Sequence, residues 1–347
     1  MNPHIFASLL FGLGLGTIIT LTSSHWLLAW MGIEINTLAM IPIMARHHHP
    51  RATEAATKYF LTQAAAAATL LFAATTNAWL TGQWDIQQIM HPVPNALMII
   101  ALAMKMGLAP LHSWLPEVLQ GLDLTTGLLL STWQKIAPFA LLLQIPSDNP
   151  TLMIMIGLTS TIVGGWGGLN QTQLRKILAY SSIAHLGWMI LIMQFSPALA
   201  TLALLTYFIM TSSTFLMFKL NNSTNLNTLA ISWAKTPALT TLAPLLLLSL
   251  GGLPPLTGFM PKLLILQELG KQDLAPAATL AALSALLSLY FYLRLSYAMT
   301  LTTSPNNLAG TTPWRLQHLP ATLPLSILIM ATLLLLPLTP ASIALLL

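Results

Sequence analysis

The ten residues 107–116 (GLAPLHSWLP) interrupt an apolar stretch of the chain with one glycine and two prolines. A similar segment, GLPPLTGFMP, occupies residues 252–261, and five of the ten aligned positions are identical. Proline removes a backbone donor and ends a helix, which hydrocarbon tolerates only where the freed backbone faces protein or a wet cavity. Paired interruptions of this kind are typical of transporters with broken helices. The pattern therefore predicts that each segment breaks a membrane helix beside a polar interior.

The composition indicates an integral membrane protein. Only 6% of the 347 residues are charged and 55% are hydrophobic, whereas an ordinary soluble domain is about 25% charged. So few charges cannot cover a soluble fold of this size, which excludes a soluble enzyme, a disordered tail and a nucleic-acid-binding protein. The net charge of +5 spreads 13 cations along the chain and forms no patch for a polyanion. The absence of cysteine excludes disulfides, thiolate-bound zinc and cysteine-ligated iron–sulfur clusters.

The apolar stretches predict an all-α polytopic fold with about eleven membrane-spanning helices, since about 20 apolar residues cross the hydrocarbon core. The two interrupted segments fall in the fourth and ninth spans, five helices apart, so the second copy is inverted relative to the first. This arrangement predicts two inverted five-helix units, 1–145 and 146–300, followed by a loop and a C-terminal helix in 301–347. The predicted spans are 3–22, 25–45, 57–80, 95–116, 123–145, 150–170, 174–194, 197–219, 237–258, 275–298 and 322–345.

The basic residues predict the orientation of the chain. With an odd number of spans the termini lie on opposite sides, and nine Lys or Arg residues fall on the N-terminal side. The other side has Lys271 alone, if Lys262 is assigned to the membrane interior. Positive residues accumulate on the cytoplasm-equivalent side, so we expect the N-terminus there. The first span has no basic region or cleavage site, which favours a permanent helix over a signal peptide. The nine residues are Arg46, Arg51, Lys58, Arg175, Lys176, Lys219, Lys235, Arg294 and Arg315.

Four ionisable residues lie inside or beside the predicted spans: Glu34, Lys105, Lys135 and Lys262. Each costs about 2.5–3.5 kcal/mol to insert, which calls for a function. In a continuous helix Lys105 would lie roughly ten residues from either end, too deep to reach water, and Lys135 would be similarly central. Burial favours a neutral lysine and a nearby carboxylate favours a charged one, so such a set can exchange protons as its neighbours change charge. We expect a proton relay. The alternative, static ion pairs, would leave two lysines without an acid partner.

Three further residues are secondary candidates for proton transfer. His112 lies beside the first interruption and His185 in the seventh span, where each would either carry protons or act as a packing donor. Lys176, near the start of the seventh span, would either join the relay or extend to the basic surface. The run His47–His49 has the chemistry to bind a metal, but no carboxylate or thiolate accompanies it, so we expect no metal site.

Four segments of the chain resemble the antiporter-like membrane subunits of respiratory complex I. They are residues 103–116, 178–187, 252–262 and 30–36, and the resemblance extends over essentially the whole chain. It implies two inverted five-helix units with a lateral C-terminal helix, and proton translocation coupled to electron transfer in other subunits. It also implies that NAD, FMN, iron–sulfur clusters and ubiquinone belong to those other subunits and that this chain binds no cofactor.

The resemblance also implies roles for individual residues. Glu34 would be the acid that modulates Lys105, Lys135 the central relay, and Lys262 the lysine of the second unit next to the opposite surface. The implied location is the mitochondrial inner membrane, with the N-terminus in the matrix and the C-terminus in the intermembrane space. This orientation agrees with the distribution of basic residues.

The implied partners are other membrane-arm subunits, including neighbouring antiporter-like subunits, and lipids, with no nucleic acid. Bacterial relatives have three more helices at the N-terminus than this sequence. Their absence would leave one flank of the first unit open, and we expect accessory subunits to cover it. Because of this difference, the resemblance does not assign the route by which protons enter the first unit.

Two other functions fit part of the pattern. A stand-alone cation/proton antiporter has similar broken helices, but one glutamate against three lysines makes a poor cation site. A purely structural subunit would retain the buried charges without using them.

Overall fold

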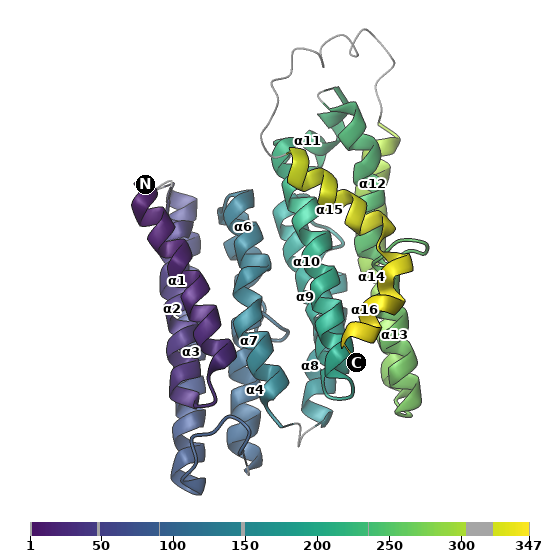
Figure 1. Cartoon of the computed structure of the whole chain (residues 1–347). Helices are drawn as coiled ribbons and strands as arrows, with labels where there is room; N and C mark the ends of the chain where they lie inside the picture. The colour runs from purple at the N-terminus through teal and green to yellow at the C-terminus, as the bar shows by residue number, and fades with distance from the viewer. Residues whose placement is uncertain are drawn as a thin grey trace. The chain divides into compact units, whose positions relative to one another are not determined.

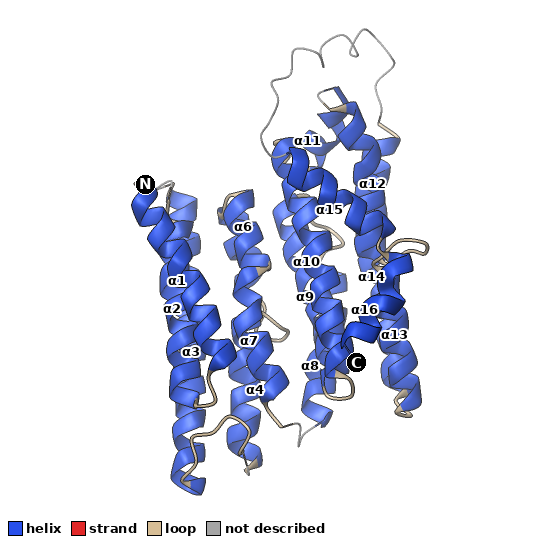
Figure 2. Cartoon of the chain, viewed as in Figure 1, coloured by secondary structure: helices blue, strands red, loops and turns tan. Residues whose placement is uncertain are grey.

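The computed structural model describes residues 2–46, 49–89, 91–146, 150–234, 236–302 and 322–346, and within these ranges the chain forms helices and no β-strand (Figure 2). Two compact units are present, Met1–Gly157 and Leu158–Leu347. Among the described helices, seven are long and apolar enough to cross a membrane. This confirms a helical membrane protein, whereas the count of eleven spans stays a prediction. The seven are α1 (Pro3–Thr22), α2 (Trp26–Met44), α3 (Pro50–Thr81), α8 (Pro150–Gly167), α9 (Leu174–Met193), α10 (Pro197–Leu220) and α14 (Ala275–Thr300).

In the first unit, α1, α2 and α3 pack side by side in chain order (Figure 1). Helix α3 also contacts α4 (Pro92–Met106) and α5 (Trp114–Gly121), while α6 (Leu124–Ser131) precedes α7 (Trp133–Gln144). Helix α7 contacts α1, α2 and α4, so residues of α2, α3, α4 and α7 surround a common interior. Helix α3 begins earlier than the predicted 57–80, because the His49 side chain accepts a hydrogen bond from the Arg51 N–H and caps the helix.

In the second unit, α9 and α10 form the centre. Helix α10 contacts α9, α12 (Pro237–Gly251) and α13 (Phe259–Lys271), and α14 packs on α12 and α13. Every residue of α9 from 181 to 193 is buried, as expected for a helix that is apolar on all faces. A short helix, α11 (Leu226–Ala230), contacts α14.

Both predicted helix breaks are present, and they share one backbone conformation. Gly107 ends α4 with φ 78° and Gly252 ends α12 with φ 79°, the left-handed region that favours glycine. The N–H of Leu108 then bonds the carbonyl of Ala103, and the N–H of Leu253 bonds that of Leu248, so the two helix ends close in the same way. A cis X-Pro peptide bond follows at Pro110 and at Pro255.

Two expectations about the fourth and fifth spans are wrong. Lys105 is not central in a continuous helix, because α4 ends at Met106, one residue later. Lys135 is not central either, since α6 ends before Thr132 and Lys135 lies in the first turn of α7. Each lysine therefore lies next to an interruption of its helix, where backbone groups are freed.

Two further helices were not expected in this form. Helix α13 follows the second break, where the sequence predicted no separate element between 258 and 275. The predicted C-terminal helix 322–345 is divided into α15 (Thr322–Leu334) and α16 (Thr339–Leu346) by a 3-10 turn, Leu336–Leu338. Pro337, which has no N–H to donate, lies in that turn. Helix α15 packs on α10 and α12, and α16 packs on α10 (Figure 1).

Close packing of α1 on α2 depends on two facing glycines, Gly16 of α1 and Gly32 of α2. A Cβ atom at Gly16 would lie 2.6 Å from the Asn36 Oδ1 and 2.7 Å from the Gly32 carbonyl oxygen. A Cβ atom at Gly14, two residues away on the same helix, would meet nothing within 4 Å. Small residues of this kind let membrane helices approach closely where apolar side chains alone give no driving force.

We predict that Gly16→Ala destabilises the α1–α2 contact by about 1–3 kcal/mol, because the added methyl group overpacks the interface. The matched control is Gly14→Ala, which should be neutral. The measurement is the fraction of the detergent-extracted protein that stays folded across a temperature series. Equal losses for both variants would contradict the proposed contact.

Candidate functional site

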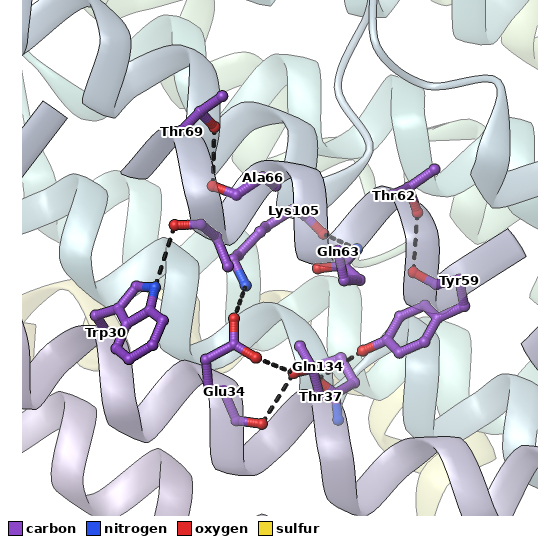
Figure 3. Close-up of polar contacts among 11 residues, drawn as sticks. Trp30, Glu34, Thr37, Tyr59, Thr62, Gln63, Ala66, Thr69, Lys105 and Gln134 are labelled. Atoms are coloured by element: carbon purple, nitrogen blue, oxygen red, sulfur yellow. Dashed lines mark hydrogen bonds and ion pairs between the residues drawn. The ribbon is translucent and has the colours of Figure 1, made fainter. Parts of the chain in front are cut away.

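Glu34 and Lys105 form a loose ion pair in the first unit. Glu34 lies in the middle of α2, and its Oε1 is 4.0 Å from the Nζ of Lys105 in the last turn of α4 (Figure 3). The lysine side chain is 2% exposed and the glutamate side chain 25%. The buried Nζ has no hydrogen-bond partner among the described residues. At 4.0 Å the two groups attract each other electrostatically but are too far apart for a direct hydrogen bond.

The break after Lys105 is held by side chains from other helices. Gln63 of α3 donates its Nε2 hydrogen to the carbonyl oxygen of Lys105 at 3.3 Å (Figure 3). Trp114 of α5 donates its Nε1 hydrogen to the carbonyl oxygen of Met104 at 3.1 Å. The Met104 carbonyl also accepts the N–H of Gly107 at 3.2 Å, and both carbonyls belong to the last turn of α4. The two side-chain donors therefore join α3 and α5 to the end of α4, beside Lys105.

Lys105 and Lys135 line a common cavity of about 20 Å³. Lys135 is itself 2% exposed. A polar cavity needs roughly 10–15 Å³ to hold one water molecule, so this cavity is large enough for one. Asn36 lines it as well, and neither atom of its buried side-chain amide has a hydrogen-bond partner among the described residues. The other polar side chains of the lining are Thr37, Tyr59, Gln63 and Gln134.

Thr37 links Glu34 to this cavity. Its hydroxyl group donates to the Glu34 carbonyl oxygen at 2.9 Å, lies 3.2 Å from Glu34 Oε2, and belongs to a residue of the cavity wall (Figure 3). The structure thus brings Glu34, Lys105 and Lys135 together within the first unit. Thr37 is uncharged and was not predicted, although its place three residues after Glu34, on the same helix face, was the available signal.

Lys262 lies at the second break, in the first turn of α13. Its Nζ donates a hydrogen bond to the carbonyl oxygen of Gly251, the last residue of α12, at 2.7 Å. A Cβ atom at Gly252 would lie 2.9 Å from both the Cδ and the Nζ of this lysine, so only glycine leaves room for the side chain. Lys262 also lines an open, mainly apolar groove of about 480 Å³ formed by α12, α13 and α14.

His185 lies near Lys262 in the second unit. Both residues line one small cavity of about 10 Å³ together with Thr206. The imidazole ring is 9% exposed, and its centre lies 5.6 Å from the ring of Tyr207. The structure therefore brings these two predicted residues together.

The remaining candidates lie elsewhere. His112 lies in the segment between α4 and α5 with its Nδ1 3.2 Å from the Pro110 carbonyl oxygen, and Lys176 is half-buried in the first turn of α9. Neither lines the cavities described above. His47 and His48 fall outside the described residues. Within the described ranges, no group of three or more His, Cys, Asp or Glu side chains could hold a metal ion.

The arrangement has the chemistry of proton transfer. Lysine, glutamate and a water molecule each have a form that donates and a form that accepts a proton. A loosely paired, buried lysine gains or loses its proton when a neighbouring charge changes. The geometry therefore defines a polar interior, inside an apolar helical protein, that connects a carboxylate to two lysines.

Comparison with protein families first identifies the class. The family described as "NADH:quinone oxidoreductase/Mrp antiporter, TM" matches residues 23–288, and "NADH dehydrogenase subunit 2 C-terminus" matches residues 289–343. The chain is therefore an antiporter-like membrane protein, as the resemblance of its motifs predicted.

Comparison with individual proteins then identifies the family member. The chain is 73% identical to the NADH-ubiquinone oxidoreductase chain 2 of Tetraodon nigroviridis, over 98% of each protein. It is 70% identical to the chain of the same name in Gadus morhua, over 100% of this chain and 99% of that one. The chain thus belongs to the NADH-ubiquinone oxidoreductase chain 2 family.

Solved structures share the fold. A chain of respiratory complex I from Thermus thermophilus with bound aureothin is 28% identical and superposes with a TM-score of 0.81, covering 97% of this chain and 80% of that one. A chain of the Mrp complex from Dietzia sp. DQ12-45-1b is 17% identical with a TM-score of 0.80, covering 97% and 76%. At that identity the second likeness concerns the fold alone.

We predict that Glu34→Gln shifts the pH profile of turnover toward lower pH. The neutral amide no longer attracts the ammonium group of Lys105 as the carboxylate does, so the charged form of the lysine loses stabilisation. The measurement is NADH:ubiquinone turnover of the assembled complex across a pH series. The matched control is Glu117→Gln, because the Glu117 side chain is 53% exposed and pairs with Lys58 at the surface. A profile that does not move relative to this control would contradict coupling between Glu34 and Lys105.

Proposed function

We propose that protons pass through this chain along Glu34, Lys105, Lys135 and Lys262, driven by redox chemistry in other subunits of NADH:ubiquinone oxidoreductase. The chain is a proton-translocating membrane subunit of that enzyme. The observation that carries the proposed route is the water-sized cavity lined by both Lys105 and Lys135. His185 joins the route in the second unit, where it shares a cavity with Lys262.

The proposed step begins at Glu34. A change of charge or hydration near this partly exposed carboxylate alters the proton affinity of Lys105 across their 4.0 Å separation. Lys105 then exchanges a proton with Lys135 through the cavity between them. Thr37, which hydrogen-bonds to the carboxylate and lines the cavity, supports coupling of Glu34 to the two lysines. His112 and Lys176 remain secondary members of the proposed route.

The proposed architecture is a pair of inverted five-helix units, residues 1–145 and 146–300, with a C-terminal part at 301–347. The matching glycine conformations at Gly107 and Gly252 support the repeat. Four further spans, each made of two shorter helices separated by an interruption, would bring the seven long helices to eleven spans. These pairs are α4 with α5, α6 with α7, α12 with α13, and α15 with α16.

We propose the mitochondrial inner membrane as the location, with the N-terminus in the matrix and the C-terminus in the intermembrane space. The vertebrate relatives named above support this location. Neighbouring membrane-arm subunits, accessory subunits and lipids would cover the apolar surface of the first unit, where Phe11 is 71% and Phe72 61% exposed. NAD, FMN, iron–sulfur clusters and ubiquinone would bind other subunits.

The decisive experiment is Lys135→Ala in the assembled and reconstituted complex. Removal of the central amine should lower proton pumping and coupled ubiquinone reduction together, because the route loses a proton carrier. The measurement is protons pumped per electron, with turnover. Lys219→Ala, which removes an exposed lysine at the end of α10, is the matched control.

Normal turnover and normal stoichiometry in assembled Lys135→Ala would contradict the relay and favour a structural subunit. Sodium transport by the purified chain in liposomes would instead favour a cation/proton antiporter.

A further inference from the structure

Two side chains outside the proposed route close the cavity between Lys105 and Lys135. Gln134, the residue before Lys135, donates its Nε2 hydrogen to the Asn36 carbonyl oxygen at 3.3 Å. Its Oε1 lies 3.5 Å from the hydroxyl oxygen of Tyr59, which donates to it (Figure 3). Both ends of the amide are therefore held, so its oxygen and nitrogen have a defined orientation.

Tyr59 is a rigid part of the cavity wall. It lies on α3, is 1% exposed, and its ring centre is 5.9 Å from that of Trp114, at an interplanar angle of 60°. The bonds of Gln134 connect α7 to α2 through Asn36 and to α3 through Tyr59. Three helices are thus tied together at the cavity, and Gln134 and Tyr59 both belong to its lining.

The chemistry of lysine explains why these two residues matter to a water molecule. An ammonium group only donates hydrogen bonds, so a water molecule beside two charged lysines must place its own hydrogens on other acceptors. The phenol oxygen of Tyr59 and the amide oxygen of Gln134 are acceptors in the wall of the cavity. When Lys135 is neutral, its nitrogen becomes a competing acceptor for the same hydrogens.

We propose that Tyr59 and Gln134 are positioning residues for proton transfer, which hold one water molecule between Lys105 and Lys135. In the step itself, the ammonium group of Lys105 gives a proton to the water oxygen as the water gives one of its own to neutral Lys135. Lys105 becomes neutral, Lys135 becomes charged, and the water is regenerated. The inference rests on the proposed function, because it requires transfer between these lysines.

The test uses variants that remove only polar atoms. Tyr59→Phe removes one oxygen and keeps the ring, and Gln134→Met keeps the length of the side chain. The matched controls are Tyr290→Phe, at a 58% exposed tyrosine of α14, and Gln144→Met, at the end of α7 itself. The measurement is pumping-coupled turnover of the reconstituted complex in light and in heavy water.

We expect each single variant to lower turnover severalfold and to raise the ratio of rates in light and heavy water above that of the parent. The ratio rises because proton transfer becomes the slow step. The double variant should lose no more than the larger single variant, since both act through one water molecule. The two controls should behave as the parent.

An unchanged isotope ratio alongside reduced turnover would assign the two residues a structural role and overturn the inference, as would losses that add in the double variant. Lys135→Ala, measured in parallel, separates this from the proposed function. If it abolishes pumping while Tyr59→Phe and Gln134→Met match their controls, only the inference fails. If it pumps normally, the proposed function fails. Should Gln134→Met not assemble, Tyr59→Phe and its isotope ratio decide.

Discussion

Backbone groups inside hydrocarbon must find partners, and in this chain that requirement is concentrated where α4 and α12 end. Gly107 and Gly252 turn the chain out of its helix and leave carbonyls that no residue of the helix can reach. Gln63 satisfies one at the first break, and Lys262 satisfies one at the second. Gln63 and Lys262 also line the cavities beside these breaks, so the side chains that cap the helix ends form part of the polar interior.

The looseness of the Glu34–Lys105 pair suits proton exchange better than a tight pair would. A short, fully hydrogen-bonded bridge holds both charges, and breaking a buried one costs about 3–5 kcal/mol. At 4.0 Å, with no direct hydrogen bond to the amine among the described residues, the two charges interact without locking each other. The carboxylate is partly exposed and the lysine is buried, so a change outside the first unit acts on Glu34 directly and on Lys105 through Glu34.

Charge in an apolar sequence was enough to predict the membrane class and to select residues that the structure brings together. Lys105 and Lys135 share a cavity, and so do His185 and Lys262. Their roles in transfer stay predictions. The depth assigned to Lys105 was wrong because the predicted span 95–116 ran through the break, whereas the left-handed conformation of Gly107 ends the helix at Met106. Helix α13 was not predicted because Lys262, Glu268 and Lys271 interrupt the run of apolar residues by which spans were recognised. Gln134 and Tyr59 are uncharged, and only the fold shows that they meet.

The bond from Lys262 to the Gly251 carbonyl survives a change of charge on the lysine. An ammonium group has three N–H donors and a neutral amine still has two, so either form can hold the oxygen that lies 2.7 Å away. The bond can therefore join α12 to α13 whether the lysine is charged or neutral. If Lys262 carries protons as proposed, the contact between the two helices need not open when the lysine releases one.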